Sequence, residues 1–273
     1  MRKNDKIIPM ENEAITTARR ILIYVAYDGT SYHGFQVQSG VPTIEGVLNE
    51  TLSSLFKEDI AVIGASRTDS GVHSKGNIAV FDTYAHIPAE KVPYALNRQL
   101  PGDIRIVGAA EVKPDFHPRH TDTRKTYEYR IICSPFESPI NRLYAHWTYN
   151  ELDVGLMQRG AEFLKGEHDF KSFCSVNTQA ESTVRTIYDI SVVTEKVEGD
   201  SKEIVISVTG NGFLYNMVRI IAGTLMEVGR GKYPSEKVKE MLEACDRSAA
   251  GPTAPAKGLM LARYEICDRD IFI

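Results

Sequence analysis

The stretch RILIYVAYDGT at residues 20–30, followed by PTIEGVLNETLSSLFK at residues 42–57, decides the fold of this chain. Residues 21–27 are all β-branched, aromatic or otherwise apolar, and they end at the turn signal Asp28-Gly29, so they predict a strand. In the second stretch, apolar side chains recur at helical spacing from Ile44 to Phe56, which predicts a helix. Together the two stretches predict a β-α unit.

The residues that follow extend this unit. A short apolar run at 60–63 leads into a glycine-flanked loop at 64–71, and a strand is expected at 77–82. Pro88 marks the start of a helix through Leu96, and residues 104–110 predict a further strand. The resulting order is βαββαβ, which is typical of an α+β unit.

A second set of elements repeats this order. The strand KTYEYRIIC at 125–133 and a helix at 152–164 come first. Two strands, at 185–194 and 203–209, are expected to form a hairpin because a turn-rich segment joins them. A helix at 213–229 carries apolar side chains on more than one side, which predicts burial, and a last helix at 235–244 precedes a strand at 259–266.

The repeated order predicts an α+β fold built from two βαββαβ halves of the RRM-like or ferredoxin-like type. We expect their antiparallel sheets to be joined around a central basic cleft. The predicted division is a flexible N-terminal tail at 1–19, a first half at 20–115 that carries the loop at 64–71, and a second half at 116–273.

The composition is that of an ordinary globular protein, with 42% hydrophobic and 25% charged residues among 273. The N-terminal residues lack the apolar run of a secretory signal, and no apolar stretch reaches the roughly 18 residues of a membrane span. The four cysteines form no C-x-x-C pair. We therefore expect a cytoplasmic protein with reduced thiols and no membrane partner. The net charge of −4 does not indicate a nucleic-acid partner unless basic residues gather in one groove.

The loop GASRTDSGVH at residues 64–73 holds the strongest candidate for chemistry. Asp and Ser beside Gly are ordinary turn formers, so an isolated Asp69 would most simply hydrogen-bond the amides that follow it. Arg67, Thr68 and His73 add further polar groups to the same loop, however, and its glycines allow unusual backbone geometry. This concentration of polar groups favours a functional site.

The loop resembles the hallmark segment of the tRNA pseudouridine synthase A family, which usually has Ala or Gly where this chain has Ser66, Ser70 and Ser74. The resemblance continues through YDGTSYHGFQVQ at 27–38, the KTYEYRI strand, NGFLYNMVR at 211–219 and AKGLML at 256–261. Separated motifs in the same order are far more specific than one motif. The predicted two-half order also agrees with the pseudouridine synthase fold that the family implies.

The resemblance implies that the chain isomerises uridine to pseudouridine without a cofactor. The N-glycosidic bond is cut, the uracil turns, and its C5 is joined to ribose C1′. By similarity Asp69 is the nucleophile, and attack on ribose C1′, attack on uracil C6 and a glycal-type route all stay open. Arg219 would pair with Asp69 and keep it ionised, and Tyr127 would contact the extruded uracil. Leu259 would form an apolar wall, and Arg67 would intrude where the base has been flipped out.

The implied substrate is tRNA, modified at uridines 38, 39 and 40 of the anticodon stem and loop by a homodimer. A dimer would double a modest basic patch and so reconcile the negative net charge with RNA binding. Basic positions that could contact phosphates are Arg119, Arg124, Lys125, Arg185, Arg230 and Lys232. The chain has no dinucleotide or P-loop motif and no metal-ligand spacing beyond His117 and His120, so no cofactor and no metal are expected.

Two other functions stay open at this point. The first is a non-catalytic RNA-binding module, because split βαββαβ units are common in RNA recognition and a fold does not decide a function. The set of Arg67, Asp69, Tyr127 and Arg219 argues against it. The second is a hydrolase that uses Asp69 with His73, although no second carboxylate or metal cluster at a convincing spacing supports it.

Overall fold

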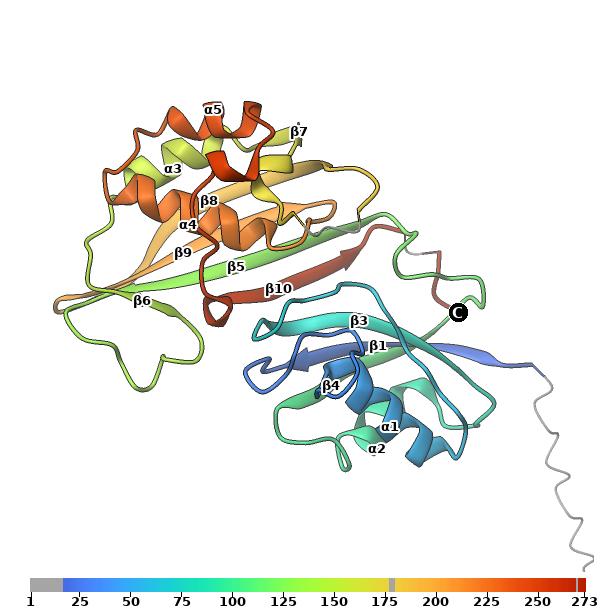
Figure 1. The fold of residues 1–273 in the computed structure, drawn as a ribbon. Helices are drawn as coiled ribbons and strands as arrows, with labels where there is room; N and C mark the ends of the chain where they lie inside the picture. Colours follow the sequence, from blue (N-terminus) through green and yellow to red (C-terminus); the bar gives the residue numbers. More distant parts are fainter. Residues whose placement is uncertain (1–16, 177–179, 269) are drawn as a thin grey trace, which may run out of the picture.

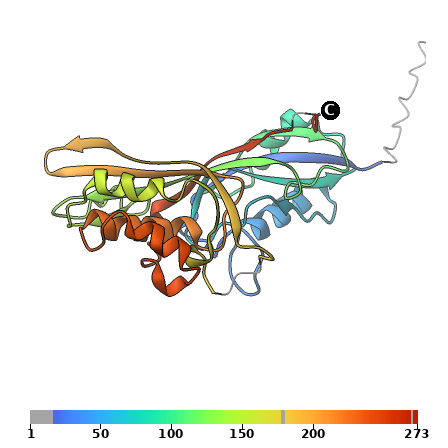
Figure 2. The same cartoon turned by 90° about the horizontal axis from the view of Figure 1, so that it is seen from above.

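The computed structural model describes residues 17–176, 180–268 and 270–273, so most of the predicted N-terminal tail lies outside the described part. Within that part the strands form a single ten-stranded sheet, and the longer helices lie on one of its faces (Figures 1 and 2). None of the described helices is long and apolar enough to cross a membrane. The predicted α+β class is confirmed.

The first half contains the predicted elements in the predicted order. They are β1 (Arg19–Tyr27), α1 (Ile44–Phe56), β2 (Ile63–Gly64), β3 (His73–Thr83), a 3-10 turn (Ala89–Lys91), α2 (Val92–Leu96) and β4 (Ile104–Val112). α1 begins where the Thr43 side chain accepts a hydrogen bond from Gly46 N at 3.2 Å, and it ends at Lys57 in the left-handed conformation. Leu48 and Leu52 on this helix are fully buried.

The second half contains all the predicted elements and two short strands besides. Its elements are β5 (Thr123–Cys133), β6 (His146–Thr148), α3 (Val154–Glu162), β7 (Gly166–Asp169), a 3-10 turn (Lys171–Phe173), β8 (Val184–Glu198), β9 (Ser201–Gly210), α4 (Met217–Gly229), α5 (Lys237–Glu243), two further 3-10 turns (Arg247–Ala249 and Ala256–Gly258) and β10 (Leu259–Ile266). The predicted hairpin of β8 and β9 is confirmed. β6 and β7 were not predicted, because strands of three and four residues are too short to show a period.

β10 joins the two halves into one sheet. The strand order is β4-β1-β3-β10-β5-β9-β8-β7, with β2 paired to β3 and β6 paired to β5. β10 completes the second half by pairing antiparallel with β5, and it also pairs in parallel with β3 of the first half. The expectation of two joined sheets is therefore confirmed, and the contact between them is a parallel seam between β10 and β3.

The seam brings distant segments of the chain together. Leu261 of β10 pairs with Ser74 on one side and with Tyr127 on the other. Since neighbouring strands lie about 4.8 Å apart, the start of β3 is roughly 10 Å from Tyr127. The loop that precedes β3 carries Asp69, so the fold places this loop beside β5.

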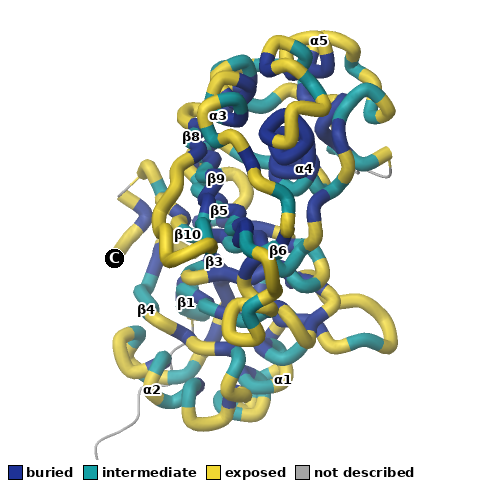
Figure 3. Tube along the Cα trace, turned by 90° about the vertical axis from the view of Figure 1, so that its left-hand side faces the viewer, coloured by how far each residue is buried: buried dark blue, intermediate teal, exposed yellow. Residues whose placement is uncertain are grey.

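α4 lies over the second half of the sheet, and all of its residues except Arg219 are buried, as the dark blue of the helix in Figure 3 shows. The predicted burial on more than one side is confirmed. The helix begins at Met217 rather than at the predicted Phe213. The physical reason is Asn216, whose φ of 61° is left-handed and incompatible with a continuous right-handed helix.

Gly223 lets α4 approach the segment at 252–254 closely. A Cβ at position 223 would lie 1.8 Å from the carbonyl oxygen of Pro252. The same segment donates a hydrogen bond from Ala254 N to the carbonyl oxygen of Arg219 at 3.0 Å. The position of α4, and with it the position of Arg219, therefore depends on the absence of a side chain at residue 223.

We expect Gly223→Ala to lower the free energy of unfolding by about 2–3 kcal/mol, because α4 has to move away from Pro252. Urea unfolding followed by circular dichroism measures this change. Gly155→Ala in α3 is the control, since its Cβ would meet only the ends of the Asp153 and Arg159 side chains. The control should be neutral or stabilising by up to about 1 kcal/mol. Equal destabilisation of both variants would contradict the close contact.

Candidate active site

The Asp69 loop connects β2 to β3 and rests on the chain that follows β1. The carbonyl oxygen of Thr68 accepts a hydrogen bond from Phe35 N at 3.1 Å, and Thr68 Oγ1 lies 2.7 Å from the buried Tyr27 hydroxyl. Gly34 has a φ of 88°, and a Cβ there would lie 2.6 Å from the Thr68 carbonyl oxygen. The YDGTSYHGF motif therefore supports the loop from below, and this contact requires a glycine.

Asp69 forms an ion pair with Arg219 from the first turn of α4. Arg219 Nη1 lies 3.3 Å from Asp69 Oδ2, and each side chain is 18% exposed. Two further oxygens hold the same guanidinium, because Nε donates to the Ala254 carbonyl at 2.8 Å and Nη1 donates to Asn216 Oδ1 at 2.6 Å. The seam of the sheet thus brings a carboxylate and its counter-ion together from the two halves of the chain.

Burial and the ion pair act on Asp69 in opposite directions. Burial raises the pKa of Asp69, since the charged form loses its hydration, while the Arg219 charge and hydrogen bond lower it. Burial is the larger effect, so the pKa of Asp69 is above the usual value of an aspartate. Arg219 therefore compensates for part of the desolvation of Asp69 and does not compensate for all of it.

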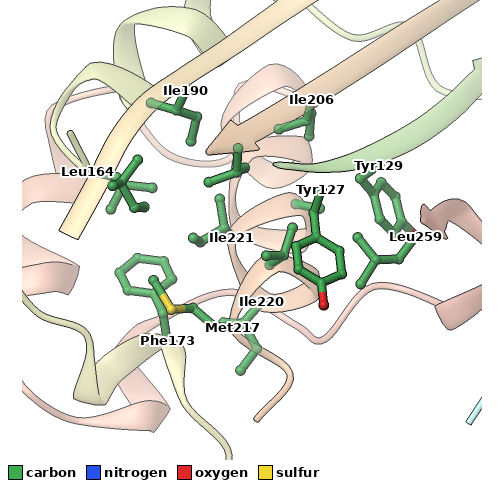
Figure 4. Close-up of a cluster of buried hydrophobic side chains, with 14 of the residues drawn as sticks. Tyr127, Tyr129, Leu164, Phe173, Ile190, Ile206, Met217, Ile220, Ile221 and Leu259 are labelled. Carbon is green, nitrogen blue, oxygen red and sulfur yellow. The ribbon is translucent and has the colours of Figure 1, made fainter. Parts of the chain in front are cut away.

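Tyr127 and Tyr129 lie on the same face of β5, as strand alternation predicts. Tyr129 is fully buried, and its hydroxyl donates to the Pro255 carbonyl at 2.9 Å, so it is the core aromatic of the two. Tyr127 is 8% exposed, and its ring packs edge to face on Phe213 at 5.2 Å between centroids. In Figure 4 the Tyr127 ring lies close to Leu259, which is buried at the start of β10.

The Tyr127 hydroxyl keeps its proton in the free protein. Burial raises the pKa of Tyr127, and the neighbouring Tyr27 hydroxyl and Asp69 carboxylate raise it further, while Ser66 opposes them. Ser66 is itself buried and stands three residues before Asp69, on the loop that faces Tyr127.

Three of the six basic candidates lie near one another at the start of β5, where the charges of Arg119 and Arg185 act on Lys125. Lys125 is two residues ahead of Tyr127 on the same face of β5, which is about 7 Å along the strand. Arg119 Nε donates to the Gly64 carbonyl at 2.8 Å, at the base of the Asp69 loop. Arg185 lies against Gly212. Gly212 is two residues after Gly210, the residue of β9 that pairs with Lys125. We call Arg119, Lys125 and Arg185 the cationic cluster.

The cationic cluster has no close counter-ion, since none of its three members has a carboxylate within 4.0 Å among the described residues. Burial, followed by the charges of Arg185 and Arg119, lowers the pKa of Lys125 to about 8. Burial and then the charge of Arg67 lower the pKa of Arg119. Arg67 itself is exposed on the loop. Positive charge therefore accumulates around Lys125 and Arg119, at the start of β5 and the base of the Asp69 loop.

The other three basic candidates lie away from Tyr127 or are already paired. Arg124 is on the opposite face of β5 and lies over the Tyr188 ring at 4.9 Å. Arg230 and Lys232 both bind Glu227, at 2.8 and 2.6 Å. They follow the C-terminal end of α4, about 16 Å along the helix from Arg219.

The histidines of the sequence analysis do not join Asp69. The His73 ring is buried, its Nδ1 accepts a hydrogen bond from Gly29 N at 3.1 Å, and its Nε2 lies 3.0 Å from the Leu143 carbonyl oxygen. Both ring nitrogens are thus engaged elsewhere, which argues against an Asp69–His73 hydrolase. The rings of His117 and His120 stack at 4.2 Å. The described residues contain no group of three or more His, Cys, Asp or Glu that could hold a metal ion.

Sequence reasoning missed Phe213, Asn216 and the support of the loop by Tyr27. Phe213 and Asn216 stand in the NGFLYNMVR motif, in which the resemblance implies a role only for the arginine. Tyr27 stands in YDGTSYHGFQVQ, a motif whose sequence alone predicts no structural role for this tyrosine. The motifs include these three residues, but only the fold shows which side chains they contact.

Comparisons with known proteins point in one direction. A family model described as tRNA pseudouridine synthase matches residues 23–120 and 161–265. A tRNA pseudouridine synthase A of Brevibacillus brevis is 47% identical over 243 residues, covering 89% of this chain and 98% of the relative. The tRNA pseudouridine synthases A of Halalkalibacterium halodurans and Ruminiclostridium cellulolyticum are 46% and 45% identical and each covers 90% of this chain, over 92% and 98% of their own lengths.

The shifted pKa of Asp69 predicts an effect on stability. Because the pKa is raised in the fold, the stabilising contribution of Asp69 is present below the pKa of the unfolded chain and is lost as the pH rises through the folded pKa. At pH 7 the fold therefore contains a desolvated carboxylate. Asp69→Asn should raise the melting temperature at pH 7 by about 2 °C or more, measured by scanning calorimetry.

Asp28→Asn is the matched control. Burial alone would raise the pKa of Asp28, but the hydrogen bonds from Thr30 and Tyr144 lower it below its usual value. This carboxylate therefore stabilises the fold above the pKa of the unfolded chain, so its removal should lower the melting temperature at pH 7. A lower melting temperature for Asp69→Asn as well would contradict our account of Asp69.

Proposed function

This chain belongs to the tRNA pseudouridine synthase family, and from that membership we propose that Asp69, Arg219 and Tyr127 form the site in which a uridine of tRNA is isomerised. The observation that carries this proposal is the ion pair of Asp69 and Arg219 beside Tyr127 at the seam of the sheet. A nucleophile, its counter-ion and an aromatic ring for the base arrive there from three separate segments.

The isomerisation is balanced within the uridine. The bond from N1 to ribose C1′ breaks, a bond from C5 to C1′ forms, C5 loses a proton and N1 gains one. Asp69 supplies the carboxylate: it is the nucleophile if attack occurs at C1′ or C6, it assists in a glycal-type route, and each route needs it ionised. Arg219 supports that ionisation against the effect of burial, which is the physical reason for an arginine at an otherwise buried helix position.

The flipped uracil would lie against Tyr127 and Leu259. An aromatic ring and an aliphatic side chain offer apolar contacts to the two sides of a flat base. The Tyr127 hydroxyl is protonated in the free protein, so it meets the base as a neutral hydrogen-bonding group. Arg67 is exposed on the loop that carries Asp69, which suits a residue that enters the space left by the flipped base.

The cationic cluster would contact the RNA backbone. Within residues 17–176, 180–268 and 270–273 its members have no carboxylate within ion-pair distance, so their charges are available for phosphates, whereas Arg230 and Lys232 are engaged by Glu227. A local group of unpaired cations also explains how a chain with a net charge of −4 attracts a polyanion. We further propose that the substrate uridines are at positions 38, 39 and 40 of the anticodon stem and loop, and that the protein acts in the cytoplasm as a homodimer.

The decisive experiment incubates the purified protein with unmodified tRNA transcripts without any cofactor and maps pseudouridine by chemical sequencing. Product at positions 38 to 40 is the expected result. Asp69→Asn should reduce the rate at least about a thousandfold while tRNA affinity stays within about threefold. Tight tRNA binding by the wild type without any product would instead indicate a non-catalytic RNA-binding module.

The cationic cluster predicts a pH-dependent affinity for tRNA. Lys125 has a pKa of about 8, so it is mostly charged at pH 7 and mostly neutral at pH 9. Lys125→Gln should weaken tRNA binding at pH 7 by about tenfold, in filter-binding measurements at fixed salt. Between pH 7 and 9 the affinity of the wild type should fall more than that of the variant. Lys232→Gln, at a position paired with Glu227, is the control and should change affinity less.

A further inference from the structure

Asn216 occupies a strained position immediately before α4. Its backbone angles, φ 61° and ψ 8°, are left-handed, a conformation that Gly and Asn adopt far more readily than other residues. Its side chain does not cap the helix, although Asn is a good capping residue. Instead the side chain contacts Arg219 and Ser175, and the left-handed backbone places it there.

Two hydrogen bonds orient the Asn216 amide. Oδ1 accepts from Arg219 Nη1 at 2.6 Å, and Nδ2 donates to Ser175 Oγ at 2.8 Å. An arginine has only donors, so the atom that faces Arg219 has to be the amide oxygen. A backbone hydrogen bond from Ser175 N to the Tyr215 carbonyl, at 3.1 Å, anchors the same contact. The amide therefore has one orientation, with its oxygen toward the guanidinium.

We infer that Asn216 is a positioning residue that sets the distance and orientation of Arg219 relative to Asp69. The nitrogen that reaches Asp69 Oδ2 at 3.3 Å is the nitrogen that binds Asn216 Oδ1 at 2.6 Å. With Nε held by the Ala254 carbonyl, the guanidinium is fixed by two neutral oxygens, and Asp69 takes the longer contact. This inference rests on the proposed function of the pair.

The acceptor at position 216 is uncharged, and this determines how much of the positive charge of Arg219 acts on Asp69. The amide oxygen holds Arg219 without neutralising it, so its positive charge stays available to Asp69. A carboxylate in the same place would form a charge-assisted bond with Arg219 and add a negative charge near Asp69, which disfavours ionisation of Asp69. A residue without a side-chain acceptor would leave Nη1 free to move. Asparagine therefore meets both requirements: it adopts the left-handed backbone readily, and its side chain offers an uncharged oxygen to Arg219.

The test compares Asn216→Gly and Asn216→Asp in single-turnover conversion of unmodified tRNA by the full chain. Both variants tolerate the left-handed backbone. Asn216→Gly should lower the single-turnover rate by about tenfold with tRNA affinity within about twofold of the wild type, because only the alignment of the pair is lost. Asn216→Asp should move the acid limb of the pH–rate profile to higher pH. Arg219 lowers the pKa of Asp69 through its charge and hydrogen bond, and Tyr127 is a second titratable group that interacts with Asp69.

Lys57→Gly is the matched control, because Lys57 also has a left-handed backbone, with φ 59°, at the end of α1. Its rate and pH profile should equal those of the wild type. Wild-type rates and an unshifted acid limb in both Asn216 variants would overturn the inference while leaving the proposed function intact. A loss confined to tRNA affinity would also overturn it. If Asn216→Gly has a lower melting temperature than the wild type, its rate no longer tests the inference. The acid limb of the Asn216→Asp pH–rate profile then tests it alone. A wild-type protein without product would refute the proposed function instead.

Discussion

The pairing of β10 with both β3 and β5 is the constraint on which the rest of the structure depends. β10 completes the second half as its outer strand and at the same time continues the sheet of the first half. Without this double pairing, the loop before β3 and the face of β5 would belong to separate sheets. Asp69 would then have no neighbour from α4, since Arg219 comes from 150 residues further along the chain.

The seam also explains the electrostatics of the site. Joining the two halves buries the carboxylate of Asp69, and this burial opposes the ionised form that the proposed chemistry needs. Arg219, held by the Ala254 and Asn216 oxygens, offsets only part of the effect of burial on the pKa of Asp69. The fold thus retains a destabilised carboxylate at the proposed active site, and groups with perturbed pKa values are common in active sites.

Most of the fold could be predicted from the sequence, because its longer elements have clear periods and boundaries. The exceptions have local causes: β6 and β7 are too short to show a period, and Asn216 shortens α4 by its left-handed backbone. The motifs indicated Asp69, Arg219, Tyr127, Arg67 and Leu259 as candidates, and the structure brings Asp69 to Arg219. Which of the basic residues are unpaired could not be predicted, since pairing with Glu227 depends on how α4 ends.

The position of β10 in the element order has a consequence for biosynthesis. A ribosome releases the chain from its N-terminal side, and every other helix and strand is made before β10. The nascent protein can fold its first half early, but it cannot join Asp69 to Arg219 and Tyr127 until β10 has emerged and docked. We therefore expect an unfinished chain to be inactive toward transfer RNA, because the proposed active site is assembled only when β10 docks.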